Sequence, residues 1–208
     1  MKERRYEVVE KIYDFNELSE SAKEMARNAY LEEFRDCDFF TEDCLYQLKE
    51  LFPNSDLKVE YSLSSCQGDG FNIYGDMFLK DAINYVYSKS DRLNKYGRFF
   101  EWLKTLDYTL RISENKARYS YCYIDYNDFV YDIMDDLEQD GYTANYEEHE
   151  KAVTLFSCVF KNLIGKLCKE FENDGYNYFY EVEDEEIIEV WECNGYEGFY
   201  EDGKPCYC

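Results

Sequence analysis

The residues best suited to chemistry lie in the segment YSLSSCQGDGFNIYG, where a cysteine precedes two closely spaced glycines. Glycine-rich loops that bind phosphate have the spacing GxxxxGK[ST] or GxGxxG and lead into a helix. Here the glycines lead into a strand-like run, and Asp69 would put a carboxylate where the anion should lie. The pattern therefore predicts a turn between two strands at Gly68, Asp69 and Gly70, with glycine supplying the positive φ angle of such turns.

A nucleophilic role for Cys66 would require a general base, and the chain has a single histidine, His149. His149 lies between Glu148 and Glu150 at the polar start of a predicted helix. Nothing in the sequence brings it close to Cys66. We therefore interpret Cys66 as a structural cysteine and His149 as a solvated surface residue.

The nine cysteines also raise the question of a metal site. Structural zinc sites are usually built on C-x2-4-C pairs, and the sequence contains none. The closest groupings are Cys193 with Cys206 and Cys208, and Cys37 with Cys44. We expect free thiols and no metal or other cofactor. Because no pair of carboxylates stands out as an acid–base couple either, we predict that the protein is not an enzyme.

A stronger pattern is a row of acidic residues on one predicted helix, DFVYDIMDDLEQD. Its apolar residues would form one face: Phe129, Val130, Ile133, Met134 and Leu137. The opposite face carries a polar row at i, i+4, i+7, i+8 and i+11: Asp128, Asp132, Asp135, Asp136 and Gln139. Carboxylates four residues apart on a helix are spaced about 6 Å along its axis, of the order of the charge spacing in nucleic acid.

A second acidic cluster begins another predicted helix, DEEIIEVWEC, after a predicted strand, YNYFYEV. Its members are Glu181, Glu183, Asp184, Glu185, Glu186 and Glu189. Nearby aromatic residues would anchor a partner protein: Tyr126, Tyr131, Tyr178 and Tyr180. The alternative is an acidic face that is solvated and serves only solubility.

The charge of the whole chain favours a binding surface. The formal net charge is -23 over 208 residues, and its distribution is uneven. Residues 1–119 contain 18 Lys/Arg and 23 Asp/Glu, whereas residues 120–208 contain 5 and 23. Such a charge repels nucleic acid and anionic membranes and attracts basic partners. Direct binding to nucleic acid or to a membrane is thereby excluded as the main activity.

The order of predicted elements indicates an α+β fold in one domain, residues 1–208, with a near-neutral part, 1–119, and a strongly acidic part, 120–208. Besides the segments above, strands are predicted in YEVVEKIYDF, DLKVEYSLS and GFNIYG, and hairpins in YTLRISENKARYSYCYID and YEGFYEDGKPCY. Helices are predicted in NELSESAKEMARNAYLEEF (capped by Ser19 or Ser21), TEDCLYQLKELF (from Thr41), LKDAINYVYSK, RLNKYGRFFEWLKTL and NYEEHEKAVTLFSCVFKNLIGKLCKEFEND. This order predicts antiparallel hairpins packed by helices.

Three segments resemble a family of small acidic proteins of bacteriophages and prophages, often labelled antitoxin-like. They are YDFNELSESAKEMA, YSLSSCQGDGFNIYG and VEDEEIIEVWECNGYEGFYEDGKPC. The resemblance implies a setting among accessory phage genes, which include inhibitors of host defence, and supplies no catalytic residues. The size and acidity also resemble those of anti-CRISPR and anti-restriction proteins, several of which mimic the charge of nucleic acid.

We therefore expect a phage-encoded inhibitor that binds a bacterial defence nuclease, in particular a Cas9-like CRISPR effector, and blocks its nucleic-acid groove. The absence of a long apolar run and the scattered cysteines predict a cytoplasmic location in the infected host. One alternative is an antitoxin-like protein that neutralises a basic toxin. Another is an enzyme that modifies a defence component. The edge of the last hairpin would also allow a homodimer.

Overall fold

The computed structural model describes residues 11–64, 68–112, 126–139 and 146–206, and the chain divides into two compact units. Unit 1 comprises residues 1–39 and 176–208, and unit 2 comprises residues 40–175. The division falls within two helices, α2 (Cys37–Leu51) and α6 (Tyr146–Tyr180). The predicted α+β class is confirmed, whereas the single domain stays a prediction.

Unit 2 contains an antiparallel sheet in the order β1, β2, β3. Its strands are β1 (Asp56–Ser62), β2 (Gly70–Phe78) and β3 (Thr109–Ile112). The first two pair from Ser62 opposite Gly70 to Asp56 opposite Asp76, which confirms the strand–turn–strand prediction. The third strand pairs with the far end of β2. The rest of the hairpin predicted after it lies outside the described residues.

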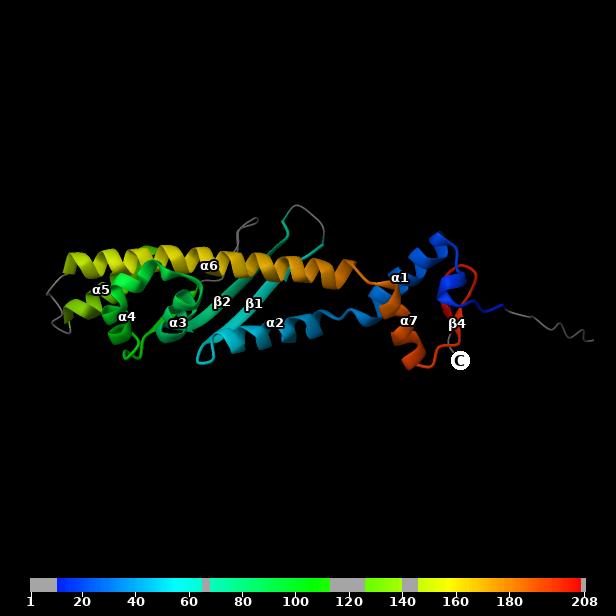
Figure 1. Ribbon diagram of the computed structural model, residues 1–208, viewed down its shortest axis with the longest axis horizontal. Helices are drawn as coiled ribbons and strands as arrows, with labels where there is room; N and C mark the ends of the chain where they lie inside the picture. The colour runs from blue at the N-terminus through cyan, green and yellow to red at the C-terminus, as the bar shows by residue number, and fades with distance from the viewer. Residues whose placement is uncertain (1–10, 65–67, 113–125, 140–145, 207–208) are drawn as a thin grey trace, which may run out of the picture. The chain divides into compact units, whose positions relative to one another are not determined.

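One face of this sheet is covered by α2 and α6 (Figure 1). The ring of Phe40 in α2 lies 5.3 Å from that of Tyr61 in β1. The ring of Phe171 in α6 lies 5.2 Å from that of Phe71 in β2. Because residues two apart in a strand share a face, Ile73 and Met77 point the same way as Phe71, and all three are buried.

The remaining elements of unit 2 are helical: α3 (Leu79–Lys89), the 3-10 helix η2 (Asp91–Tyr96), α4 (Gly97–Leu103) and α5 (Tyr126–Gln139). The prediction of one helix over RLNKYGRFFEWLKTL is wrong, because a 3-10 helix occupies its first part and α4 begins at Gly97. The 3-10 helix begins after Ser90, whose hydroxyl caps it by accepting a hydrogen bond from the N–H of Arg92, 3.3 Å away.

A buried carboxylate joins three elements of unit 2. Asp81, in the first turn of α3, is only 2% exposed. It accepts hydrogen bonds from the backbone N–H of Asn54 at 2.8 Å and from the hydroxyl of Ser55 at 2.9 Å. The Ser55 hydroxyl in turn accepts from the N–H of Phe78 at 3.0 Å. These hydrogen bonds give the buried carboxylate of Asp81 the polar partners that a buried polar group requires.

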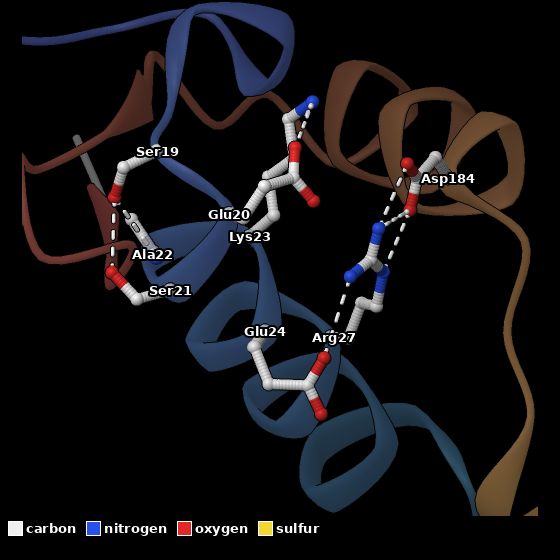
Figure 2. Close-up of polar contacts among 8 residues, drawn as sticks. All are labelled: Ser19, Glu20, Ser21, Ala22, Lys23, Glu24, Arg27 and Asp184. Carbon is white, nitrogen blue, oxygen red and sulfur yellow. Dashed lines mark hydrogen bonds and ion pairs between the residues drawn. The ribbon is translucent and has the colours of Figure 1, made fainter.

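Unit 1 has its own apolar core. Its elements are η1 (Phe15–Glu17), α1 (Glu20–Phe34), α7 (Asp184–Cys193), β4 (Gly198–Phe199) and β5 (Pro205–Cys206). Trp191 of α7 packs between the rings of Tyr30 and Phe199, at 5.6 and 5.0 Å between centroids. The predicted final hairpin is confirmed, and Gly203 in its turn has φ +88°. The N-cap of α1 is Ser19, whose hydroxyl accepts from the N–H of Ala22 (Figure 2).

Three predicted boundaries are corrected by the structure. The second helix begins at Cys37 rather than Thr41, because the Asp36 carboxylate accepts a hydrogen bond from the N–H of Asp38 at 2.7 Å. The strand predicted in YNYFYEV is wrong, because α6 continues to Tyr180. Of the first predicted strand, residues 6–15, only 11–15 are described, and there the prediction is wrong: Tyr13 forms an isolated bridge with Phe199, and Phe15 begins the 3-10 helix η1.

No helix in the described part of the chain has both the length and the apolar character needed to cross a membrane.

Candidate acidic binding surfaces

The helix α5 presents an acidic and aromatic face away from its buried side. Its buried residues include three of those predicted: Ile133, Met134 and Leu137. Its exposed residues follow at i, i+4 and i+7: Tyr131, Asp135 and Glu138. The side chain of Tyr131 is prominent, because the residue is 66% exposed.

The start of α6 adds to this face. Partial burial, followed by the negative charges of Glu150, Glu138 and Asp135, raises the pKa of the Tyr146 phenol. The carboxylates of α5 are therefore close enough to Tyr146 to influence its ionisation, although they belong to a different helix. We call Tyr131, Asp135, Glu138, Tyr146 and Glu150 together the α5–α6 patch.

The sequence pattern identified only part of this patch. Glu138, Tyr146 and Glu150 were missed, because the prediction considered one helix alone and their proximity depends on packing between α5 and α6. Of the predicted acidic row, Asp135 and Gln139 are exposed. The other predicted residues lie on α5, but their side chains are outside the described part of the structure: Asp128, Asp132, Asp136 and Tyr126.

The second predicted cluster, around α7, contains two carboxylates that are engaged within unit 1. Asp184 receives two hydrogen bonds from Arg27 of α1: Nε to Oδ1 at 2.8 Å and Nη2 to Oδ2 at 3.0 Å (Figure 2). Arg27 also makes an ion pair with Glu24 at 3.4 Å. The charge of Asp184 is therefore directed at α1 rather than at a partner.

Glu186 forms the second connection between α7 and α1. Its Oε1 accepts hydrogen bonds from Arg35 Nη2 and from the Tyr30 hydroxyl, both at 2.7 Å. Burial, followed by this hydrogen bond, raises the pKa of Tyr30 to about 12. Arg35 also lies 4.8 Å above the ring of Tyr178, which is half-buried. Glu186 and Tyr178 thus belong to the packing of unit 1.

The other carboxylates predicted in this cluster are exposed: Glu181, Glu183, Glu185 and Glu189. Tyr180 beside them is 49% exposed. The described residues of unit 1 contain 18 Asp/Glu and 5 Lys/Arg, and four of those five bases form ion pairs with carboxylates of the same unit: Lys23, Arg27, Arg35 and Lys204. The surface of unit 1 is therefore strongly negative even after its internal ion pairs are counted.

The loop before β2 has the geometry expected of a turn. Gly68 has φ +134°, and Asp69 accepts a hydrogen bond from the Ser62 hydroxyl at 3.1 Å. Gly70 begins β2 opposite Ser62. Cys66 lies outside the described residues. The loop is thus closed by a contact between its own ends.

Four of the described cysteines are free thiols: Cys44, Cys158, Cys193 and Cys206. Burial, followed by nearby carboxylates, raises the pKa of Cys44 to about 12, so this thiol is unreactive at neutral pH. Among the residues that the structure describes, no group of three or more His, Cys, Asp or Glu side chains could hold a metal ion. Cys208 lies outside those residues.

The interpretation of His149 as a solvated surface residue is wrong. Its ring stacks face to face on Phe99, with 4.3 Å between centroids and 5° between planes. Its Nδ1 atom is buried and has no hydrogen-bond partner in the described part of the structure. The flanking glutamates suggested exposure, but the flat ring of His149 packs against an aromatic side chain of α4.

The acidic surfaces thus consist of the α5–α6 patch in unit 2 and the exposed carboxylates near α7 in unit 1. Comparisons with known proteins add no further assignment. No model of a protein family matches the chain, and neither a curated protein nor a solved structure matches it.

Proposed function

We propose that the protein is a stoichiometric inhibitor that binds a basic, nucleic-acid-binding surface of another protein. The observation that carries this proposal is the α5–α6 patch, which combines exposed carboxylates and exposed tyrosines from two helices. Like charges on one surface repel one another, and a basic partner relieves that repulsion on binding. The exposed rings of Tyr131 and Tyr146 would supply the apolar contacts that anchor such an interface.

The exposed carboxylates near α7 form a second surface of the same character. Glu185 and Glu189 are one helical turn apart and both exposed, whereas Asp184 and Glu186 are held by arginines of α1. The proposal therefore assigns partner binding to Glu185, Glu189 and their exposed neighbours Glu181 and Glu183. Asp184 and Glu186 serve the stability of unit 1.

The partner we propose is a bacterial defence nuclease, with a Cas9-like CRISPR effector as the first candidate. Such effectors hold their heteroduplex in a positively charged channel and read the adjacent motif with arginines. The inhibitor would act in the cytoplasm of the infected cell. An antitoxin-like protein that neutralises a basic toxin would use the same surfaces. An enzyme that modifies a defence component is the alternative of a different class.

A titration of guide-loaded Cas9-type effector with the purified protein tests this proposal. We expect inhibition of DNA binding and cleavage that saturates at a fixed molar ratio, together with a complex that co-elutes in gel filtration. Inhibition far below that ratio, with an altered effector, would indicate the enzyme. Absence of any complex would contradict a Cas9-like target, and the same titration with basic toxins would then test the antitoxin alternative.

Charge reversal locates the binding surface. The double variant Asp135→Lys/Glu138→Lys should weaken binding by about tenfold or more and reduce its dependence on salt, since fewer ionic contacts form across the interface. The matched control is Glu170→Lys/Asp174→Lys, which changes the charge equally at two exposed carboxylates one turn apart on α6. Equal weakening by both variants would mean that net charge, and not the α5–α6 patch, determines binding.

A further inference from the structure

A cavity in unit 2 has a character opposite to that of the acidic surfaces. It has a volume of about 800 Å³ and lies between the η2–α4 segment and the first turn of α6. The residues that matter for its chemistry are Lys95, Arg98, Phe99, Trp102, Glu148 and His149. A few hundred to a thousand Å³ is the usual size of a small-molecule site, and the lining of this cavity combines aromatic rings with polar and charged side chains.

Three aromatic side chains, Phe99, Trp102 and His149, line the cavity, and we call them its aromatic wall. Phe99 stacks on His149 with 4.3 Å between centroids, and its ring lies 6.1 Å from that of Trp102 at an interplanar angle of 29°. All three residues are half-buried, so part of each ring is accessible. His149 covers one face of Phe99, so a planar aromatic ligand would stack on the ring faces that these three residues leave accessible, as any aromatic base can.

Two cations lie beside this wall. Lys95 and Arg98 are exposed, and neither forms an ion pair with a carboxylate in the described part of the chain. The ammonium of Lys95 lies 4.4 Å from the ring centroid of Tyr96. Glu148 is the one carboxylate among the described residues that line the cavity. Among the described residues that line the cavity, two cations thus accompany one carboxylate, in a chain whose net charge is -23.

We propose that this cavity binds a purine nucleoside monophosphate. The purine would stack on the aromatic wall, Lys95 and Arg98 would bind the phosphate, and Glu148 would accept a hydrogen bond from an N–H group of the base. A polynucleotide would be repelled by the acidic surface as a whole, whereas a small anion can enter a cavity lined by two cations. The residues assigned to this site belong to neither acidic surface, although Glu148 and His149 lie between Tyr146 and Glu150 of the α5–α6 patch in the sequence.

Isothermal titration calorimetry of the full chain with AMP and GMP tests the proposal. We expect saturable one-to-one binding with a dissociation constant below about 1 mM for at least one of them. Adenosine, which lacks the phosphate, and inorganic phosphate, which lacks the base, should each bind at least about tenfold more weakly. Wild-type protein that shows no saturable binding of either nucleotide up to about 10 mM would overturn the proposal.

Variants assign the binding to the cavity. Lys95→Ala/Arg98→Ala should weaken binding of the nucleotide by about tenfold or more. The control Lys89→Ala/Arg92→Ala removes two exposed cations from the preceding helical turns and should leave binding unchanged. His149→Phe should retain more affinity than His149→Ala, since it keeps the stacked ring. Thermal melting confirms that each variant is folded, and equal losses in both double variants would overturn the assignment.

Discussion

Glu185 and Glu186 are neighbours in α7, yet their surroundings assign them different roles. The side chain of Glu186 is 38% exposed and accepts hydrogen bonds from Arg35 and Tyr30. Tyr30 is only 2% exposed, so its hydroxyl depends on this acceptor. Glu185 points to solvent. An acidic run in a sequence therefore contains both structural and surface carboxylates, and only the contacts tell them apart.

Truncation of the two residues should separate these roles. Glu186→Ala should lower the free energy of unfolding by about 1–2 kcal/mol, because a buried hydroxyl and a guanidinium lose their acceptor. Glu185→Ala, with the same change of charge, should remain within about 0.5 kcal/mol of wild type. Urea denaturation followed by circular dichroism measures both. Similar losses in the two variants would contradict a structural role specific to Glu186.

The helix α6 shows how one element meets different neighbours along its length. At Gly165 a β-carbon would find open space, whereas at Gly175 it would meet the side chains of Leu63 and Phe40. Glycine at position 165 makes no close contact, and its only effect is to increase the backbone entropy that the unfolded chain loses on folding. At the second position it allows α6 to approach α2 and the end of β1 closely.

Alanine at these two positions should therefore change stability in opposite directions. Gly165→Ala should raise the free energy of unfolding by about 0.5–1 kcal/mol, because alanine is the better helix former. Gly175→Ala should lower it by about 1 kcal/mol or more, because Leu63 and Phe40 must move. Thermal and urea unfolding of both variants test this. Stabilisation by Gly175→Ala would show that the contact can relax without cost.

Local patterns predicted those elements whose signals lie within a few residues. The helix LKDAINYVYSK and the helix DEEIIEVWEC have the predicted bounds, and the β1–β2 hairpin follows its alternation. YNYFYEV was misassigned because Tyr and Phe favour strands on average. In the structure, Tyr176 and Tyr180 instead pair one helical turn apart, with 6.1 Å between ring centroids.

The candidate sites were harder to predict, because they depend on residues far apart in sequence. Arg27 and Asp184 are separated by 157 positions, and nothing local marks them as partners. The approach of Tyr146 to α5 likewise required the packing of two helices. Composition predicted an acidic binding protein, whereas the division of its carboxylates between stability and surface required the structure.

At the scale of the whole molecule, self-repulsion of the net charge of -23 should make stability depend on salt. Raising sodium chloride from about 20 mM to about 500 mM shortens the Debye length from roughly 20 Å to a few ångströms. The melting temperature should therefore rise by several degrees, as scanning calorimetry can measure. The surface ion pairs of unit 1 oppose this trend only weakly. A melting temperature that falls with salt would show that attractive pairs dominate.

The helices α1 and α7 have a consequence for synthesis on the ribosome. The buried side chains of α1 include Ala22, Ala26 and Tyr30, and they pack against Ile187 and Trp191 of α7. Because translation proceeds from the N-terminus, α1 emerges long before its partner, and unit 1 can be completed only after unit 2 has been made. A nascent chain halted before residue 176 would expose the apolar side of α1 to chaperones and proteases. Only chains translated through both segments would carry the complete acidic unit.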